Sequence, residues 1–139
     1  MRATAQITDF LKTEGVNYRD CDRMIRDGIP WEAVTDIKKE LDLTDAELAR
    51  ILDVSERTLS RLRQSNKKLA ASTGDRLYRL VNIYSLARKV FEAGQAARKW
   101  LHQPQVGLGA RTPLDYLRTE AGAREVEDLL GRIEYGVIS

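Results

Sequence analysis

The segment 44–64, TDAELARILDVSERTLSRLRQ, contains two short amphipathic patterns that are separated by only a few residues. Thr44 is a good helix-capping residue, and Glu47 three positions later completes the pattern of a capping box. Ser55 is a second capping candidate, directly ahead of the second pattern. Two helix starts this close together leave room only for a tight turn near Asp53. The chain must therefore pack one short helix across another.

The residues inside this segment meet the steric demands of a helix-turn-helix. Ala49 is small enough for a second helix to cross the first one closely. Asp53 occupies the turn position where glycine is common, and Asp tolerates a left-handed backbone better than most residues. Val54 can plug the crossing, and Leu59 and Leu62 provide the buried side of the second helix. We therefore predict a helix-turn-helix over these residues.

The second helix of this motif is basic on its outer face. Between residues 55 and 68 there are five basic residues and one acid, which gives a local charge of +4 in a chain whose formal net charge is only +2. Arginine is the usual reader of guanine in the major groove, and lysine is suited to phosphates. The alternative is a helical hairpin whose charged face is simply solvated. We predict that the DNA-binding residues are Ser55, Glu56, Arg57, Thr58, Ser60, Arg61, Arg63, Gln64, Lys67 and Lys68.

Along the rest of the chain, apolar residues recur with a helical period, and strand-type alternation is hard to find. We predict an all-α fold. A long helix is expected after a polar turn, with Ser72 or Thr73 as its cap and its end near Ala93. The segment PLDYLRT is expected to form a further helix, and Gly122 is expected to break the chain before the last helix.

The length of 139 residues allows two small lobes. We place the helix-turn-helix lobe at 1–70 and a second helical lobe at 71–139. One cysteine and one histidine provide neither an internal disulfide nor a metal-ligand set, so we expect no metal and no cofactor. No apolar run is long enough to cross a bilayer, and the first residues lack a signal-peptide core, so we expect a cytoplasmic protein without a membrane partner. The sequence shows no recognisable catalytic set, and we predict that the protein is not an enzyme.

The second lobe carries a series of short motifs in a fixed order. They are Arg76-Leu77 with Arg79-Leu80, then Ala96-Ala97, Trp100-Leu101, Pro104, Leu108-Gly109, TPLDYL, Gly122 and VEDLLGRIEYG. In this series, residues 72–139 resemble the toxin-binding domain of the Xre/MbcA/ParS family of antitoxins, and the helix-turn-helix is similar to the Xre-type half that precedes it in that family. One departure is Gln105, where family members often have Asn.

The resemblance implies a partner and two tasks. The expected partner is a co-encoded toxin of the RES type, which consumes NAD. The C-terminal lobe and tail are expected to cover its active site, while the N-terminal lobe represses the promoter of the operon. A homodimer within a larger toxin–antitoxin complex is expected, because operator half-sites usually match a two-fold protein. The residues we expect to contact the toxin are Arg111, Arg118, Arg132, Tyr135, Gly136, Val137, Ile138 and Ser139.

The apolar tail can be interpreted in two ways. Val137 and Ile138 can enter a cleft on the toxin, or they can fold back on the long helix. Two other functions also remain open at this point. The protein can be a freestanding transcription regulator whose second lobe dimerises or senses a ligand, or an interaction module whose helix-turn-helix no longer binds DNA.

Overall fold

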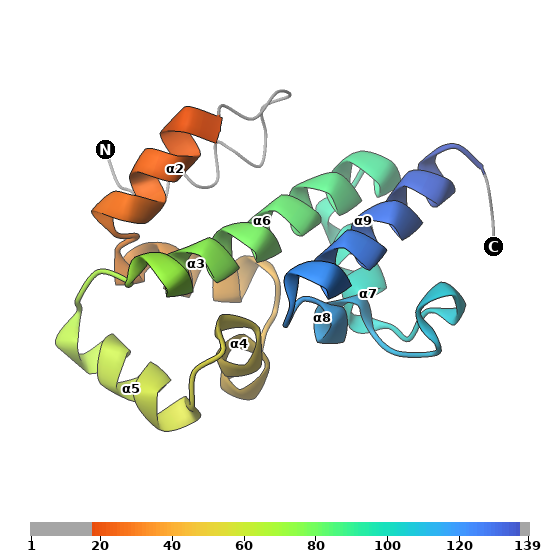
Figure 1. Cartoon of the computed structure of the whole chain (residues 1–139). Coiled ribbons are helices and arrows are strands. Elements are labelled where there is room, and N and C mark those ends of the chain that lie inside the picture. The colour runs from red at the N-terminus through yellow and green to blue at the C-terminus, as the bar shows by residue number, and fades with distance from the viewer. Residues whose placement is uncertain (1–17, 137–139) are drawn as a thin grey trace. The chain divides into compact units, whose positions relative to one another are not determined.

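The computed structural model describes residues 18–136, and these residues are folded into helices, which confirms the predicted all-α class (Figure 1). The longest helix is α6 (Ala71–Phe91). The chain divides into two compact units, and the boundary between them falls within this helix. Unit 1 is Met1–Tyr78 and unit 2 is Arg79–Ser139. Within the described residues, no helix is both long enough and apolar enough to span a bilayer.

Unit 1 is built from short helices and the first part of α6. The short helices are α2 (Tyr18–Asp27), α3 (Trp31–Glu40), α4 (Asp45–Leu52) and α5 (Glu56–Ser65). α3 and α4 each contribute a buried apolar stripe, as the periodicity predicts, whereas α2 and α5 each bury a single residue. Trp31 on α3, Leu48 on α4 and Leu59 on α5 are all buried, and so is Leu77 on α6. This core fixes the relative orientation of α4 and α5, which carry the predicted motif.

The start of α6 differs from the prediction. The helix begins at Ala71, so Ser72 and Thr73 lie inside its first turn and do not cap it. The reason lies in Leu69, which is buried, and whose amide donates a hydrogen bond of 2.9 Å to the carbonyl oxygen of Ile29. This bond holds the segment before the helix against the core, and α6 begins two residues after Leu69. The helix ends at Phe91, slightly earlier than predicted.

Unit 2 consists of the rest of α6 and the elements that follow it. These are α7 (Gly94–His102), the 3-10 turn η1 (Val106–Leu108), α8 (Pro113–Tyr116) and α9 (Glu120–Glu134). Trp100 is buried, and the centroid of its ring lies 5.5 Å from that of the Phe91 ring. The short helix α8 packs against both α7 and α9.

Gly122 does not break the chain, contrary to the prediction, but lies in the first turn of α9. The break comes earlier, because α8 ends at Tyr116 and the hydroxyl of Thr119 caps α9 by accepting a hydrogen bond of 2.9 Å from the amide of Gly122. A Cβ atom at Gly122 would overlap the carbonyl oxygen of Tyr116. The glycine is therefore required by the close approach of two backbones and not by a turn.

Candidate functional site

The turn between α4 and α5 has the geometry that the sequence predicts for a helix-turn-helix. Asp53 has φ 57° and ψ 46°, the left-handed conformation expected at this position. The amide of Val54 donates a hydrogen bond of 3.0 Å to the carbonyl oxygen of Ala49, which closes the end of α4. Ala49 is buried, as close helix crossing requires. Leu59 is fully buried as predicted, whereas Leu62 is only partly buried.

Both predicted caps are confirmed. The Thr44 hydroxyl accepts a hydrogen bond of 3.1 Å from the amide of Glu47, and the Glu47 carboxylate accepts one of 2.8 Å from the amide of Thr44. At the start of α5, the Ser55 hydroxyl accepts a bond of 3.0 Å from the amide of Thr58. These caps fix where each helix begins, so the outer face of α5 has a defined set of residues.

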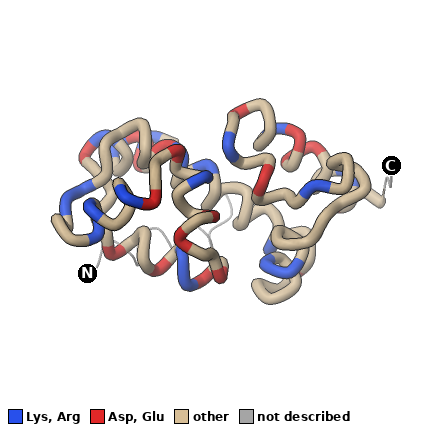
Figure 2. The backbone as a smooth tube through the Cα atoms, turned by 90° about the horizontal axis from the view of Figure 1, so that it is seen from below, with Lys and Arg blue, Asp and Glu red and all other residues tan. Residues whose placement is uncertain are grey.

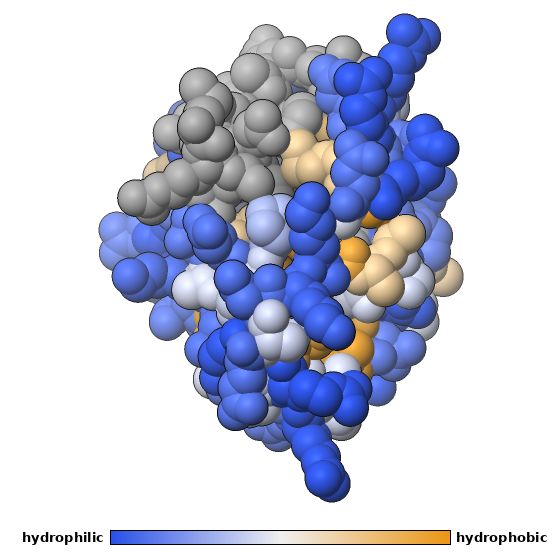
Figure 3. Space-filling model, turned by 90° about the vertical axis from the view of Figure 1, so that its left-hand side faces the viewer, coloured by the Kyte–Doolittle hydropathy of each residue, from blue (hydrophilic) through white to orange (hydrophobic). Residues whose placement is uncertain are grey.

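That outer face is exposed, apart from Thr58, which is partly buried. In Figure 2, blue segments follow one another along α5 and the turn after it. Figure 3 shows a face of unit 1 that is mostly hydrophilic. The other predicted DNA-binding residues are all exposed, namely Ser55, Glu56, Arg57, Ser60, Arg61, Arg63, Gln64, Lys67 and Lys68.

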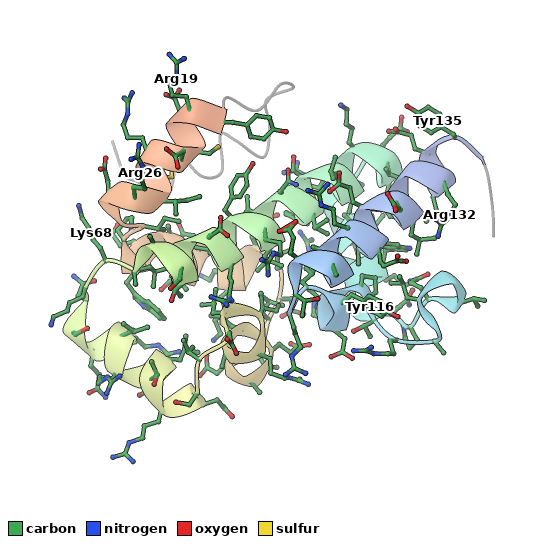
Figure 4. All side chains as sticks on the ribbon, in the orientation of Figure 1. Arg19, Arg26, Lys68, Tyr116, Arg132 and Tyr135 are labelled. Carbon is green, nitrogen blue, oxygen red and sulfur yellow. The ribbon has the colours of Figure 1, made fainter. Side chains whose placement is uncertain are left out.

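The basic residues of this face fall into two groups. Among the described residues, no ion pair engages Arg57, Arg61, Lys67 or Lys68, so their charges are available to a ligand. Lys68 is partly anchored, because the first atoms of its side chain pack closely against Gly28 at the end of α2, and Figure 4 shows it beside that helix end. The charged end of a lysine can still reach solvent from such a position.

Arg63 is also exposed but differs from its neighbours because other residues of unit 1 engage its charge. Its guanidinium lies 2.9 Å from a carboxylate oxygen of Asp45 and 5.9 Å from the centre of the Trp31 ring. Lys38 contacts the same carboxylate oxygen at 2.9 Å. The hydrogen bond from Lys38, together with the positive charge of Arg63, lowers the pKa of Asp45. Arg63 therefore ties α5 to α3 and α4, a structural role that the sequence analysis did not detect.

In unit 2, the predicted toxin contacts do not form one cluster of free charges. Arg111 is engaged, since two of its guanidinium nitrogens lie 3.1 Å from a carboxylate oxygen of Asp115, and its guanidinium carbon lies 4.7 Å from the centre of the Tyr116 ring. Arg118 is exposed, and no ion pair involves it among the described residues. These two arginines therefore present different surfaces to a partner.

The remaining predicted contacts lie at the C-terminal end of α9. Figure 4 shows Arg132 and Tyr135 there, and both line a groove of 550 Å³ between α6 and α9. Tyr135 is 80% exposed. The helix ends at Glu134. Gly136, just beyond it, has φ 74° and donates a hydrogen bond of 3.1 Å to the carbonyl oxygen of Ile133. Val137, Ile138 and Ser139 lie outside the described residues.

One exposed feature was missed by the sequence analysis. The stretch HQPQVGLGART contains η1 and a bridge between Gln105 and Arg111. Val106, at the start of η1, is 90% exposed. The sequence gives little warning of this, because a valine between polar residues and glycines can equally well turn inward.

Comparison with known proteins gives matches over both units. Residues 21–82 match the model of the antitoxin Xre-like helix-turn-helix domain, and residues 86–136 match the model of the antitoxin Xre/MbcA/ParS C-terminal toxin-binding domain. These matches confirm the predicted order of a helix-turn-helix part followed by a second helical part.

Three curated relatives are named Antitoxin Xre. The protein from Yersinia enterocolitica is 33% identical over 116 residues, which cover 83% of this chain and 78% of the relative. The one from Photorhabdus laumondii is 32% identical over 117 residues, covering 84% and 79% of the two chains. The one from Pseudomonas putida is 30% identical over 112 residues, covering 81% and 69%. With a helix-turn-helix in unit 1 and the toxin-binding domain pattern in unit 2, the chain belongs to the Xre family of antitoxins.

Proposed function

We propose that this protein neutralises a co-encoded RES-type, NAD-consuming toxin and represses its own promoter. It acts as a homodimer in the cytoplasm, within a larger toxin–antitoxin complex, and catalyses no reaction itself. The observation that carries the proposal is the combination, on one chain, of a toxin-binding domain pattern with a helix-turn-helix whose outer face is exposed and basic. We assign DNA binding to residues 1–70 and toxin binding to 71–139.

The DNA-binding half of the proposal rests on the four basic residues that no ion pair engages among the described residues. Arg57 and Arg61 are exposed on α5, one helical turn apart, and suit base edges and phosphates in a major groove. Lys67 and Lys68 follow the helix and suit phosphates. Arg63 is paired within the unit, so we expect it to support the position of α5 more than to contact DNA.

The DNA-binding experiment compares variants that each remove exposed arginines. Arg57→Ala with Arg61→Ala should abolish specific binding to the promoter and lower the slope of log affinity against log salt by about two. Arg23→Ala, an exposed arginine on α2, is the matched control and should leave both quantities unchanged. Fluorescence anisotropy with promoter DNA at several salt concentrations measures them. Unchanged promoter affinity in the double variant would mean that α5 is not the recognition helix.

The toxin-binding half rests on the exposed end of α9. Tyr135 is exposed at the last turn, and the sequence continues with Val137 and Ile138. Covering one Val or Ile side chain is worth about 1.5–3 kcal/mol, so a toxin cleft that receives them would gain substantial affinity. We propose that these residues and Ser139 occlude the active site of the toxin, and that Arg111, Arg118, Arg132 and Gly136 contribute to the interface.

The toxin-binding experiment starts from a native pull-down with an N-terminal tag, which leaves the tail free. A single partner encoded next to this chain is expected in stoichiometric amount. NAD consumption by that partner is then measured with the full chain and with residues 136–139 deleted. The deletion should abolish inhibition but leave promoter binding intact. Full inhibition by the truncated chain would disprove the role of the tail, and the absence of any partner would favour a freestanding transcription regulator.

A further inference from the structure

Val106 has an unusual position for an apolar residue. Among the described residues, the large hydrophobic side chains that are strongly exposed are Tyr18, Val106 and Tyr135, and Val106 is the most exposed of them, at 90%. The two tyrosines carry hydroxyl groups that water can solvate, whereas valine has no polar side-chain atom. A single exposed apolar residue is common on protein surfaces. Its significance here depends on whether its loop is ordered.

The loop that carries Val106 is held in place from several directions. The amide of Gln105 donates a hydrogen bond of 3.0 Å to the carbonyl oxygen of Arg111, and the amide of Ala110 donates one of 2.9 Å to the carbonyl oxygen of Gln105. The Gln105 side chain donates to the carbonyl oxygen of Trp100 at 3.2 Å. These bonds close the base of the loop and tie it to α7.

The tip of the loop is anchored to the core. Leu108 is buried, and its carbonyl oxygen accepts a hydrogen bond of 3.0 Å from the hydroxyl of Tyr116. Gly107 lies so close to α9 that a Cβ atom there would be 3.0 Å from a methyl group of Leu129. Between these two fixed positions and the closed base, the backbone of Val106 has little freedom. An anchor that is already ordered loses little entropy on binding.

The location of the loop points to one partner. Figure 1 shows η1 and its loop at the same end of unit 2 as the C-terminal end of α9, where Figure 4 shows Tyr135. The stretch from Gln103 to Ala110 has no charged residue. The toxin-binding domain model covers residues 86–136 and includes this loop, so a toxin fits this surface better than DNA does.

We propose that Val106 is a second anchor for the toxin, separate from the C-terminal tail, and that it fills an apolar pocket on the toxin surface. The inference rests on the proposed function, which names the toxin as the partner. The loop holds the Val106 side chain in a fixed position, and the uncharged residues around it suit an apolar pocket on the toxin. Binding through this anchor is therefore insensitive to salt, in contrast to the binding of DNA by unit 1.

The test measures the affinity of full-length variants for the protein that co-purifies with the tagged chain. Val106→Ala should weaken binding about tenfold, and Val106→Asp about a hundredfold or more, while Val106→Ile keeps most of the affinity. The matched control is Ala121→Asp, which adds the same charge at an exposed position in the first turn of α9. It should leave the affinity unchanged. Because Val106 is exposed, the melting temperature should not change in any of its variants.

The outcomes separate this inference from the proposed function. If the wild-type chain retains no partner, both are refuted. If it retains a partner and Val106→Asp binds that partner as tightly as the wild type, only the inference is refuted. The inference is also refuted if Val106→Asp changes the oligomeric state in light scattering without changing the affinity, since the loop would then join two copies of this chain. Combining Val106→Asp with deletion of residues 136–139 should add the two losses in free energy, as expected for independent contacts.

Discussion

Helix α9 contains two glycines, and replacing each by alanine should change stability in opposite directions. At Gly122, the added Cβ atom would overlap the carbonyl oxygen of Tyr116 and lie 2.9 Å from its carbonyl carbon. Both are backbone atoms, so no side chain can rotate away, and the strain should reach the upper end of the range for overpacking, about 3 kcal/mol. Alanine gains about 1 kcal/mol over glycine in a helix. Gly122→Ala should therefore destabilise unit 2 by about 2 kcal/mol.

Gly131 is the internal control for this prediction. A Cβ atom there has no neighbour within 4 Å, so only the gain in helix propensity remains. Gly131→Ala should stabilise the protein by about 0.5–1 kcal/mol. Urea denaturation followed by tryptophan fluorescence measures both variants, and a Trp31→Phe background leaves Trp100 as the reporter for unit 2. If Gly122→Ala is as stable as the wild type, the close backbone approach does not constrain this position, and the argument fails.

Three further predictions concern unit 1. The hydrogen bond from Lys38 lowers the pKa of Asp45, so the stability that this pair provides is present above about pH 4 and is lost as the pH falls through the lowered pKa. Asp45→Asn should therefore cost stability at pH 7, and this cost should shrink as the pH is lowered below about 4 in urea denaturation. Burial is the main cause that raises the pKa of Tyr78 to about 12. Because the unfolded chain loses this proton near pH 10, stability should decline as the pH rises above about 10. Tyr78→Phe should reduce that decline in melting curves recorded at alkaline pH. Thr44→Ala should cost about 1 kcal/mol in urea denaturation, because it removes the cap of α4 and frees Glu47; equal stability of this variant would show that the capping box contributes nothing.

Local chemistry made unit 1 predictable. The capping box at Thr44, the cap at Ser55 and the left-handed residue Asp53 all act within a few residues of their own position, so the sequence was enough to locate α4 and α5. The outer face of α5 follows from the same helix phase. Its role in binding DNA remains a prediction that the experiment on Arg57 and Arg61 tests.

The predicted break at Gly122 was wrong because contacts between elements, and not the local pattern, decide that position. The position of Gly122 suggested a break, but its backbone contact with Tyr116 shows why a glycine stands inside a helix. The DNA contact of Arg63 stays a prediction, but its contacts with Asp45 and Trp31 follow only from the folded chain.

The sequence by itself determined the helical class, the helix-turn-helix and the order of the two parts, because periodicity, caps and turn residues are short-range signals. The tertiary structure decided which charges are free and which apolar residues are exposed. Val106 is the clearest example, since its exposure depends on hydrogen bonds and packing from α7, α8 and α9. The physical reason is that exposure is set by what packs against a residue, and those neighbours belong to other elements of the fold.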